Sequence, residues 1–171
     1  MSDSVILAAR LVTAYIGLGS NLQQPQQQVL RALKTLSELS LSRLLRRSPL
    51  YRTAPLGVPG QPDYVNAAAL LETALGPLDL LDQLQRIEHE MGRRRDGVRW
   101  GARIIDLDLL LYDDRQMDHP RLQLPHPELH RRAFVLVPLA DIAPADLKVP
   151  GQGALQELCA VCDTRQVTPI A

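Results

Sequence analysis

The sequence predicts one domain that combines α-helices with β-strands. With 171 residues, the chain can bury roughly 70% of the surface that its unfolded form would expose. Apolar runs of strand length alternate with longer segments in which apolar residues recur at helical spacing. The sequence contains no internal repeat and no low-complexity linker. We therefore expect a short N-terminal extension, residues 1–10, followed by a single domain over residues 11–171.

The first expected elements are a strand and a helix joined by a turn. Residues 11–19 form an apolar run typical of a buried strand, and Pro25 then opens a helix that should reach residue 39. Gly17 and Gly19 match a dinucleotide-binding loop only in part, since Leu22 replaces the third glycine and no Walker lysine follows. We interpret the two glycines as part of a tight strand-to-helix turn.

The rest of the chain predicts further strands and helices. A strand is expected at residues 44–53, followed by a loop rich in proline and glycine that could carry binding groups. Residues 64–73 predict a strand, although the alanines there would also suit a helix. Pro77 opens a helix that should end near residue 91, where Gly92 stops it. The remaining expected elements are a strand at 106–112, an extended piece at 121–124 and a closing helix at 153–162.

Two carboxylates begin the expected strand 106–112. Asp106 and Asp108 are two positions apart, so their side chains should face the same side of the strand, roughly 7 Å apart. Leu107 and Leu109 should then point into the core. This spacing suits one or two Mg²⁺ ions, which bind carboxylates and complete their coordination with water and substrate phosphates. The alternative is a solvated strand end whose acids only prevent edge pairing.

An arginine cluster precedes these acids, and guanidinium groups can bind phosphate oxygens in pairs. An arginine run can also be no more than a solvated loop. Its proximity to the two acids, to Trp100 and to two glycines favours a polyphosphate substrate. The arginines are Arg93, Arg94, Arg95, Arg99 and Arg103.

Other polar residues near these motifs have two interpretations each. His126 lies between two prolines, with Arg121 and Arg132 close in sequence, so it is either a structural histidine or a rigidly held donor to phosphate. Gln85 and Glu88 are one turn apart on the helix that leads into the arginine cluster. They belong either to a solvated helix face or to the site.

Composition argues against several other classes of function. The formal net charge is zero, so no global field recruits nucleic acid or an anionic membrane. The apolar run at residues 5–9 is too short for a membrane span or a secretory signal. Cys159 and Cys162 form a lone Cys-x-x-Cys without a second pair of zinc ligands, so we expect a structural role. These features predict a cytoplasmic protein.

Six short motifs occur in order between about Thr13 and about Pro144. The motifs are Gly19-Ser20-Asn21-Leu22, Tyr51-Arg52-Thr53, Pro55-Leu56-Gly57, Gln61-Pro62-Asp63-Tyr64-x-Asn66, Arg99-Trp100-Gly101-x-Arg103-x-Ile105-Asp106-Leu107-Asp108 and Pro125-His126-Pro127. In this order and spacing they resemble the 6-hydroxymethyl-7,8-dihydropterin pyrophosphokinase family of folate biosynthesis.

The resemblance implies a fold and a reaction. The expected fold class is α+β, a three-layer α/β/α sandwich on a mostly antiparallel, ferredoxin-like sheet. Members transfer the β,γ-pyrophosphoryl group of ATP to the pterin hydroxymethyl oxygen and release AMP. Two Mg²⁺ ions, bound with ATP, would be held by Asp106 and Asp108. The implied partners are ATP and 6-hydroxymethyl-7,8-dihydropterin, with no nucleic acid and no membrane, and we expect a monomer.

The resemblance also assigns a pterin site. Asn66 would hydrogen-bond the amide edge of the pterin, and Tyr64 and Phe134 would sandwich its ring. Backbone groups of Thr53 and Leu56 would contact the remaining polar edge.

The phosphate side of the implied site contains most of the charged residues. Arg93 and Arg103 match arginines linked to catalysis on a mobile loop, and they join Asp106 and Asp108 as expected catalytic residues. No side chain is a convincing catalytic base, so we expect Mg²⁺ coordination to activate the hydroxyl. The expected ATP-binding residues are Gln85, Glu88, Arg95, Arg99, Trp100, Arg103, Arg121, His126 and Arg132.

Departures from the family pattern occur in two loops. Ala102 replaces a proline that usually follows Trp-Gly, which could loosen the loop 92–102, expected to close over the substrates with Gly97 and Gly101 as hinges. Ala54 replaces a proline in the expected pterin loop. Neither change removes a group with a chemical role.

Two other classes of protein stay open at this point. A metal-dependent nucleotidyltransferase on a small heterocyclic substrate, or a nuclease, could use the same Asp-x-Asp motif but would transfer a different group. A non-catalytic ferredoxin-like nucleic-acid module would need exposed aromatic residues and a basic face. An aromatic content of 4% and zero net charge argue against that module.

Overall fold

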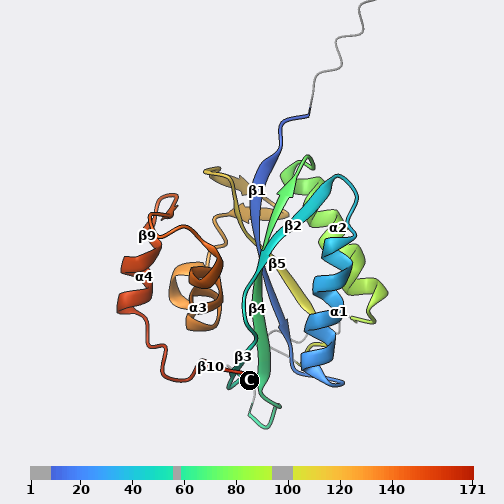
Figure 1. Cartoon of the computed structure of the whole chain (residues 1–171), viewed down its shortest axis with the longest axis vertical. Helices are drawn as coiled ribbons and strands as arrows, with labels where there is room; N and C mark the ends of the chain where they lie inside the picture. Colours follow the sequence, from blue (N-terminus) through green and yellow to red (C-terminus); the bar gives the residue numbers. More distant parts are fainter. Residues whose placement is uncertain (1–8, 56–58, 94–101) are drawn as a thin grey trace, which may run out of the picture.

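The protein is a sandwich of two helical layers around one antiparallel sheet (Figure 1). The computed structural model describes residues 9–55, 59–93 and 102–171. Helices α1 and α2 lie on one side of the sheet, and α3 and α4 lie on the other (Figure 1). The helices are α1 (Pro25–Ser37), α2 (Pro77–Glu90), α3 (Ala133–Ile142) and α4 (Leu155–Val161), with a short 3-10 helix at Leu129–Arg131.

The sheet contains six strands in the order β10-β3-β4-β1-β5, and β2 also pairs with β4. Every pairing in the described sheet is antiparallel, which confirms the expected α+β class. Two small hairpins, β6–β7 and β8–β9, lie outside it. The strands are β1 (Val12–Ser20), β2 (Ser42–Arg47), β3 (Tyr51–Thr53), β4 (Tyr64–Thr73), β5 (Asp106–Tyr112), β6 (Met117–His119), β7 (Leu122–Leu124), β8 (Lys148–Val149), β9 (Gly153–Ala154) and β10 (Thr168–Pro169).

Strand β1 lies at the centre of the sheet, between β4 and β5. Its register places Gly19 directly opposite Asn66 of β4 on one side and Asp106 of β5 on the other. Residues directly opposite one another across a sheet point to the same face. The three residues therefore form one row across the sheet, and all three line one pocket.

Helices α1 and α2 form because each begins at a proline and carries an apolar stripe. Pro25 and Pro77 occupy the first turn, where the missing backbone N–H would have no helical partner. The stripes bury residues at helical spacing against the sheet. These are Val29, Ala32, Leu33 and Leu36 in α1, and Leu80, Leu81, Leu84 and Ile87 in α2.

The opposite face of the sheet is covered by α3. Its buried residues, Leu136, Leu139 and Ile142 among them, pack on a second apolar cluster that includes Tyr15 and Leu110 from the sheet. Helix α4 packs against α3 on the side away from the sheet (Figure 1). The pocket opens on this face, beside the N-terminal end of α3.

The strand expected at residues 44–53 is interrupted. Residues 48–50 separate β2 from β3, although both strands pair with β4. Pro49 has no backbone N–H to donate to the ladder. The hydroxyl oxygen of Ser48 fills part of the gap by accepting a 2.9 Å hydrogen bond from the backbone N–H of Ala68.

The interpretation of Gly17 and Gly19 as a tight turn was wrong. Both glycines lie within β1, and the turn to α1 follows at Gln23 and Gln24, whose φ angles are 51° and 63°. The glycines serve instead to keep space open above the sheet.

The closing helix is shorter than expected, because residues 153–154 form β9 and α4 begins at Leu155. Sequence patterns also missed β10, which pairs with β3 through only Thr168 and Pro169. A two-residue strand has no detectable period. None of the helices in the described ranges has the length and apolar character needed to span a bilayer.

Candidate active site

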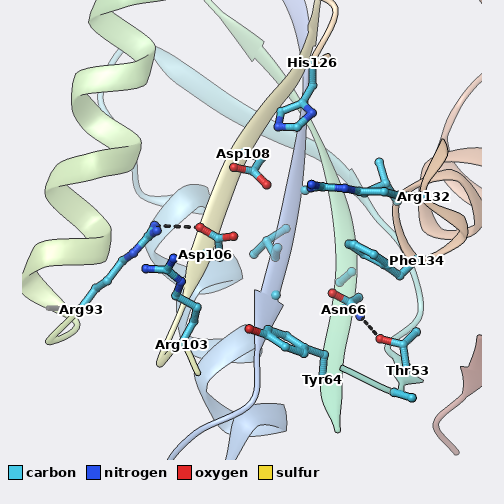
Figure 2. A pocket seen from close by; sticks show the side chains of 16 residues that line it. Thr53, Tyr64, Asn66, Arg93, Arg103, Asp106, Asp108, His126, Arg132 and Phe134 are labelled. Atoms are coloured by element: carbon cyan, nitrogen blue, oxygen red, sulfur yellow. Dashed lines mark hydrogen bonds and ion pairs between the residues drawn. The ribbon is translucent and has the colours of Figure 1, made fainter. Parts of the chain in front are cut away.

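A pocket of about 330 Å³ opens where β1, β4 and β5 are left uncovered by α3. Figure 2 shows its labelled side chains in two groups. Both acids, Arg93 and Arg103 lie on the β5 side, whereas an amide, a hydroxyl and two aromatic rings lie on the side of β3, β4 and α3. Arg132 reaches into the pocket from the α3 side, beside Phe134.

Glycines of β1 form the floor between these groups. Gly17 and Gly19 both line the pocket. A Cβ atom added to Gly19 would lie 3.0 Å from the Oδ1 atom of Asn66. Only glycine at this position therefore lets the Asn66 side chain lie over β1 without displacement.

The acid pair lies on the pocket face of β5. Asp106 and Asp108 both line the pocket, whereas Leu107 and Leu109 are buried on the opposite face, as the strand alternation predicts. Burial raises the pKa of the Asp108 carboxyl, and the charges of Asp106 and Glu88 raise it further. A cation bound beside the two carboxylates would relieve the unfavourable burial and mutual repulsion of their charges.

Arg93 partly balances the charge of the acids. Gly92, with a φ of 93°, ends α2, and the backbone N–H of Arg93 donates to the Glu88 carbonyl. The Arg93 Nη1 atom then lies 2.7 Å from the Asp106 Oδ1 atom and also pairs with Glu88. Figure 2 shows the bond to Asp106.

Glu88 lies behind the pocket. It is 4% exposed, and its Oε1 atom accepts a 2.7 Å hydrogen bond from the backbone N–H of Leu107. Burial raises its pKa, while the Leu107 bond and Arg93 act in the opposite direction. In this geometry Glu88 holds Arg93 and β5 together.

The donor set of the acid side fits a divalent cation shared with phosphate. Asp106 and Asp108 provide hard carboxylate oxygens that face the same cavity. The described residues contain no cluster of three or more histidine, cysteine or acidic side chains able to hold a metal. A cation bound here would therefore draw its remaining ligands from water and substrate, the usual coordination of Mg²⁺.

The other side of the pocket combines an amide with aromatic rings. The Nδ2 atom of Asn66 donates a 2.6 Å hydrogen bond to the Thr53 hydroxyl, which fixes the amide orientation. Tyr64 and Phe134 also line the pocket. The Arg132 guanidinium carbon lies 5.7 Å from the centroid of the Phe134 ring, within cation–π range.

His126 lines the pocket, and its contacts define the protonation state of its ring. Its Nδ1 atom accepts a 3.2 Å hydrogen bond from the backbone N–H of Glu128. Burial, followed by the charge of Arg132, lowers its pKa. The ring is therefore neutral near pH 7, with the proton on Nε2, which suits a hydrogen-bond donor to phosphate.

The structure brings together many of the residues singled out in the sequence, but not all. Arg121 pairs with Asp82 on the surface, and neither Arg121 nor Gln85 is among the described residues that line the pocket. Leu56, Arg94, Arg95, Gly97, Arg99, Trp100 and Gly101 lie outside the described residues. The described lining residues from the sequence-based set are Thr53, Tyr64, Asn66, Arg93, Arg103, Asp106, Asp108, His126, Arg132 and Phe134.

Sequence patterns alone missed two polar residues that organise the pocket edge. Asn21 is buried and bonds to two different loops, and Tyr51 joins β3 to α3 through Asp141. Both residues occur in the family motifs, but the sequence assigned no role to either. Their partners are far away in sequence and could be found only from the folded chain.

The α+β fold carries a pocket in which an acid pair and arginines lie opposite an amide and aromatic rings, a composition typical of enzymes that act on phosphorylated substrates. The family model described as 7,8-dihydro-6-hydroxymethylpterin-pyrophosphokinase matches residues 15–144. This chain belongs to that family.

Individual relatives agree with the family assignment. A protein of Pseudomonas aeruginosa named 2-amino-4-hydroxy-6-hydroxymethyldihydropteridine pyrophosphokinase is 52% identical over 148 residues, which cover 86% of this chain and 90% of the relative. A protein of the same name from Haemophilus influenzae is 51% identical over 148 residues, which cover 86% of this chain and 91% of the relative. The enzyme class expected from the motifs is therefore confirmed.

Solved structures agree with the fold. The HPPK-DHPS protein of Plasmodium falciparum, crystallised with pteroate, superposes with a TM-score of 0.71 at 16% identity. The match covers 88% of this chain but only 42% of that longer chain. At this identity, the likeness concerns the fold alone.

Proposed function

We propose that this protein transfers the pyrophosphoryl group of ATP to 6-hydroxymethyl-7,8-dihydropterin, a step of folate biosynthesis. The hydroxymethyl oxygen attacks the β-phosphorus, the bond from that phosphorus to the α,β-bridging oxygen breaks, and AMP leaves. The hydroxyl proton passes to solvent. Membership of the pyrophosphokinase family supports the reaction. The observation that carries the proposal is the row that places Asn66 and Asp106 on opposite sides of Gly19 in one pocket.

The pterin is proposed to occupy the side lined by Asn66. A pterin presents a flat ring with an amide edge, which a fixed side-chain amide can recognise by hydrogen bonds. Tyr64 and Phe134 would stack on the ring, and the backbone of Thr53 would contact its polar edge. Leu56 stays in the proposal from the family resemblance, outside the described residues.

The triphosphate is proposed to lie over β5. Asp106 and Asp108 would hold two Mg²⁺ ions, as family resemblance implies, and their orientation into the pocket is compatible with this role. When bound, the ions would neutralise phosphate charge and lower the pKa of the acceptor hydroxyl. Among the described residues that line the pocket, two carry a carboxylate, Asp106 and Asp108. The number of Mg²⁺ ions that bind there can be measured by metal titration in the presence of ATP.

Arginines and His126 would stabilise the charge that develops during transfer. Phosphoryl transfer depends mainly on alignment and on neutralising charge at the leaving and transferred groups. Arg103, Arg132 and His126 line the same pocket as the acids. Arg93 is held at Asp106 by Glu88, so it is positioned to contribute from the rear of the acid pair.

The remaining family-derived roles are also proposed. Three of these residues are on or beside α2 and outside the described pocket lining: Gln85, Glu88 and Arg121. They would contact ATP at its outer end or act on it through Arg93. Arg95, Arg99 and Trp100 would complete the ATP site. We propose that the enzyme acts as a monomer in the cytoplasm; both cysteines are free thiols, which is compatible with a reducing compartment.

Phosphorus NMR of the products tests this proposal directly. The protein is incubated with ATP and Mg²⁺, with and without 6-hydroxymethyl-7,8-dihydropterin. We expect AMP and a pterin diphosphate only when both substrates and the metal are present, and no product from Asp108→Asn. A nucleotidyltransferase would release inorganic pyrophosphate and attach AMP to the acceptor, and an ordinary kinase would release ADP. Either of those products would refute the proposal.

A further inference from the structure

The hydroxyl of Tyr51 in β3 donates a hydrogen bond to the Oδ2 atom of Asp141 in α3. Tyr51 is 8% exposed, whereas Asp141 is an exposed residue in the last turn of the helix. Burial, the hydrogen bond to Asp141 and the charge of that carboxylate raise the pKa of Tyr51 to about 12. The phenol therefore keeps its proton near pH 7 and acts as the donor. We call this pair the Tyr51–Asp141 link.

On the sheet, the link lies beside the proposed pterin side of the pocket. Tyr51 is directly opposite Asn66 across β3 and β4, so the two side chains point to the same face. Thr53 is two positions further along β3 and points to this face as well, where its hydroxyl accepts from the Asn66 amide. Tyr51 therefore neighbours the Asn66–Thr53 pair, although it is not among the described residues that line the pocket.

On the helix, the link shares one side of α3 with Phe134. Asp141 and Phe134 are seven positions apart, which is close to two helical turns, so their side chains leave the same side of the helix. Phe134 projects into the pocket from the first turn of α3 (Figure 2), and Asp141 reaches Tyr51 from the last turn. This side of α3 therefore has Phe134 at one end and the link at the other.

The first turn of α3 depends on how the helix lies on the sheet. Pro138 has no backbone N–H, so it cannot donate the usual helical hydrogen bond to the Phe134 carbonyl. Leu136 and Leu139 are fully buried and hold α3 against the sheet, but apolar packing is non-directional. A hydrogen bond has a preferred length and angle. The link can therefore fix where along β3 the helix lies.

We propose that Tyr51 and Asp141 are positioning residues that set the distance between Phe134 and the Asn66–Thr53 side of the pocket. The proposal rests on the proposed function, because this distance is the width of the slot for the pterin ring. A gap of about 0.5–1 Å loses roughly a quarter to a half of the dispersion attraction between two contacting groups. Arg132 precedes α3 and would move with it, but ATP has other contacts. Loss of the link should therefore weaken pterin binding more than ATP binding.

Two substitutions remove the link and one keeps it. Tyr51→Phe removes the donor and keeps the ring. Asp141→Ala removes the acceptor at an exposed position, where the risk to folding is small. Asp141→Asn loses the charge but keeps an oxygen that can accept from the phenol. It should therefore rescue the function that Asp141→Ala impairs.

Tyr112 provides a matched control at the other end of the sheet. It is also 8% exposed, and its hydroxyl donates to the Leu75 carbonyl at 2.6 Å. It is the last residue of β5, whereas Asp106 at the pocket is the first, and it is not among the described lining residues. Tyr112→Phe removes a bond of the same kind at the same exposure. It should lower stability without changing the pterin KM.

The first experiment measures the pterin KM at saturating ATP, the ATP KM at saturating pterin, and kcat. We expect Tyr51→Phe and Asp141→Ala each to raise the pterin KM about fivefold. The ATP KM should change less than about twofold, and kcat less than about threefold. Combining the two changes should have no larger effect than either alone, because both break the same bond. The inference is overturned if neither variant raises the pterin KM, or if Tyr112→Phe raises it equally.

Fluorine NMR tests the link without relying on activity. Phe134 is the only phenylalanine in the sequence, so labelling with 4-fluorophenylalanine gives one resonance, from the wall of the pocket. In the substrate-free protein, Asp141→Ala should shift or broaden this resonance, and Asp141→Asn should leave it as in wild type. Identical resonances in all three proteins, or equal shifts in the two variants, would refute the positioning role. A wild-type protein that makes no AMP would instead refute the proposed function.

Discussion

The two faces of the sheet have different side chains at the pocket end. On the face toward α1 and α2, apolar residues continue along the whole strand, as Ile16 and Leu18 do in β1. On the face toward α3, β5 changes from Leu110 to Asp108 and Asp106. Away from the pocket, β1 and β5 are therefore covered by apolar residues on both faces. At the pocket end, only the face toward α1 and α2 is covered.

Because of this difference, we expect one face of the sheet to determine folding stability and the open end of the other face to bind the substrates. The α1–α2 face provides a closed core that holds the strands in register, so the α3 face can leave its end open and polar. Alternation along β5 assigns Leu107 and Leu109 to the first role and the two aspartates to the second. Substitutions on the two faces should therefore have different consequences, and the following variants test that difference.

The largest effect is expected for Asp108→Asn. Loss of one carboxylate weakens cation binding at the acid pair, so kcat should fall by at least about 1,000-fold. The amide removes a charge whose burial is unfavourable, so the folded state should not be less stable. Single-turnover kinetics and thermal unfolding measure the two quantities. Normal turnover in both Asp108→Asn and Asp106→Ala would contradict the assignment of the acid pair.

Leu109→Ala tests the opposite face of the same strand. Leu109 is 2% exposed in the core under α1 and α2, and its truncation should cost about 2–5 kcal/mol of unfolding free energy. Denaturant titration measures this loss. At a temperature where the variant is folded, kcat should remain within about threefold of wild type. A large loss of kcat with little loss of stability would contradict the separation of roles.

Arg103→Ala should slow the chemical step by about 100-fold. Arg103 lines the pocket on the proposed phosphate side, where charge would develop as AMP leaves. Its loss should weaken ground-state ATP binding much less. Single-turnover rates and equilibrium ATP titration separate the two effects, and a larger change in ATP affinity than in rate would count against this role.

Gly19→Ala should affect mainly the pterin side. The new methyl group would approach Asn66 Oδ1 to 3.0 Å and disturb the bond from Asn66 to Thr53. We expect the pterin KM to rise about tenfold, equivalent to about 1.4 kcal/mol. Gly17→Ala is the matched control, because the atoms nearest to its methyl group belong to the side chain of Leu110, at 3.4 Å and beyond. Equal pterin KM values in the two variants would contradict this explanation.

The smallest expected effect is the change in thermal stability of the metal-free protein with pH. Because the pKa of Asp108 is raised in the folded state, the metal-free folded protein retains a proton that the unfolded chain loses above about pH 4. Its stability should therefore fall as pH rises from about 4 through that raised pKa, by a few degrees in Tm. Asp108→Asn should show a flatter profile, and Mg²⁺ should oppose the fall in wild type. Parallel profiles for the two metal-free proteins would refute the shift.

The sequence predicted the elements with a clear period. The 64–73 strand matches β4, and the helices starting at Pro25 and Pro77 begin as expected, because their burial patterns repeat along the chain. The break at Pro49 and the two-residue β10 depend on which strands they pair with. Local periodicity contains no information about pairing partners.

The sequence could predict which residue types form the site, but it could predict only part of how those residues are arranged in space. The carboxylates of β5 could be placed on one face by alternation alone. Glu88 could not be placed behind the pocket, because its burial follows from the bond to Leu107 and the pair with Arg93. The contacts of Asn21 span 40 to 82 residues along the chain, so they depend on tertiary structure.

The row of Asn66, Gly19 and Asp106 has a consequence for which substrates can react. Neighbouring strands are about 4.8 Å apart, so the recognition amide and the first carboxylate are about 10 Å apart at their backbones. Hydrogen-bonded ladders hold that span constant, whereas flexible side chains would not. A heterocycle whose hydroxyl stood one bond further from its ring would carry the nucleophile beyond the point of attack. Under the proposed function, the fixed spacing of the backbone would therefore select an acceptor by the distance between its ring and its hydroxyl, independently of how tightly the ring is bound.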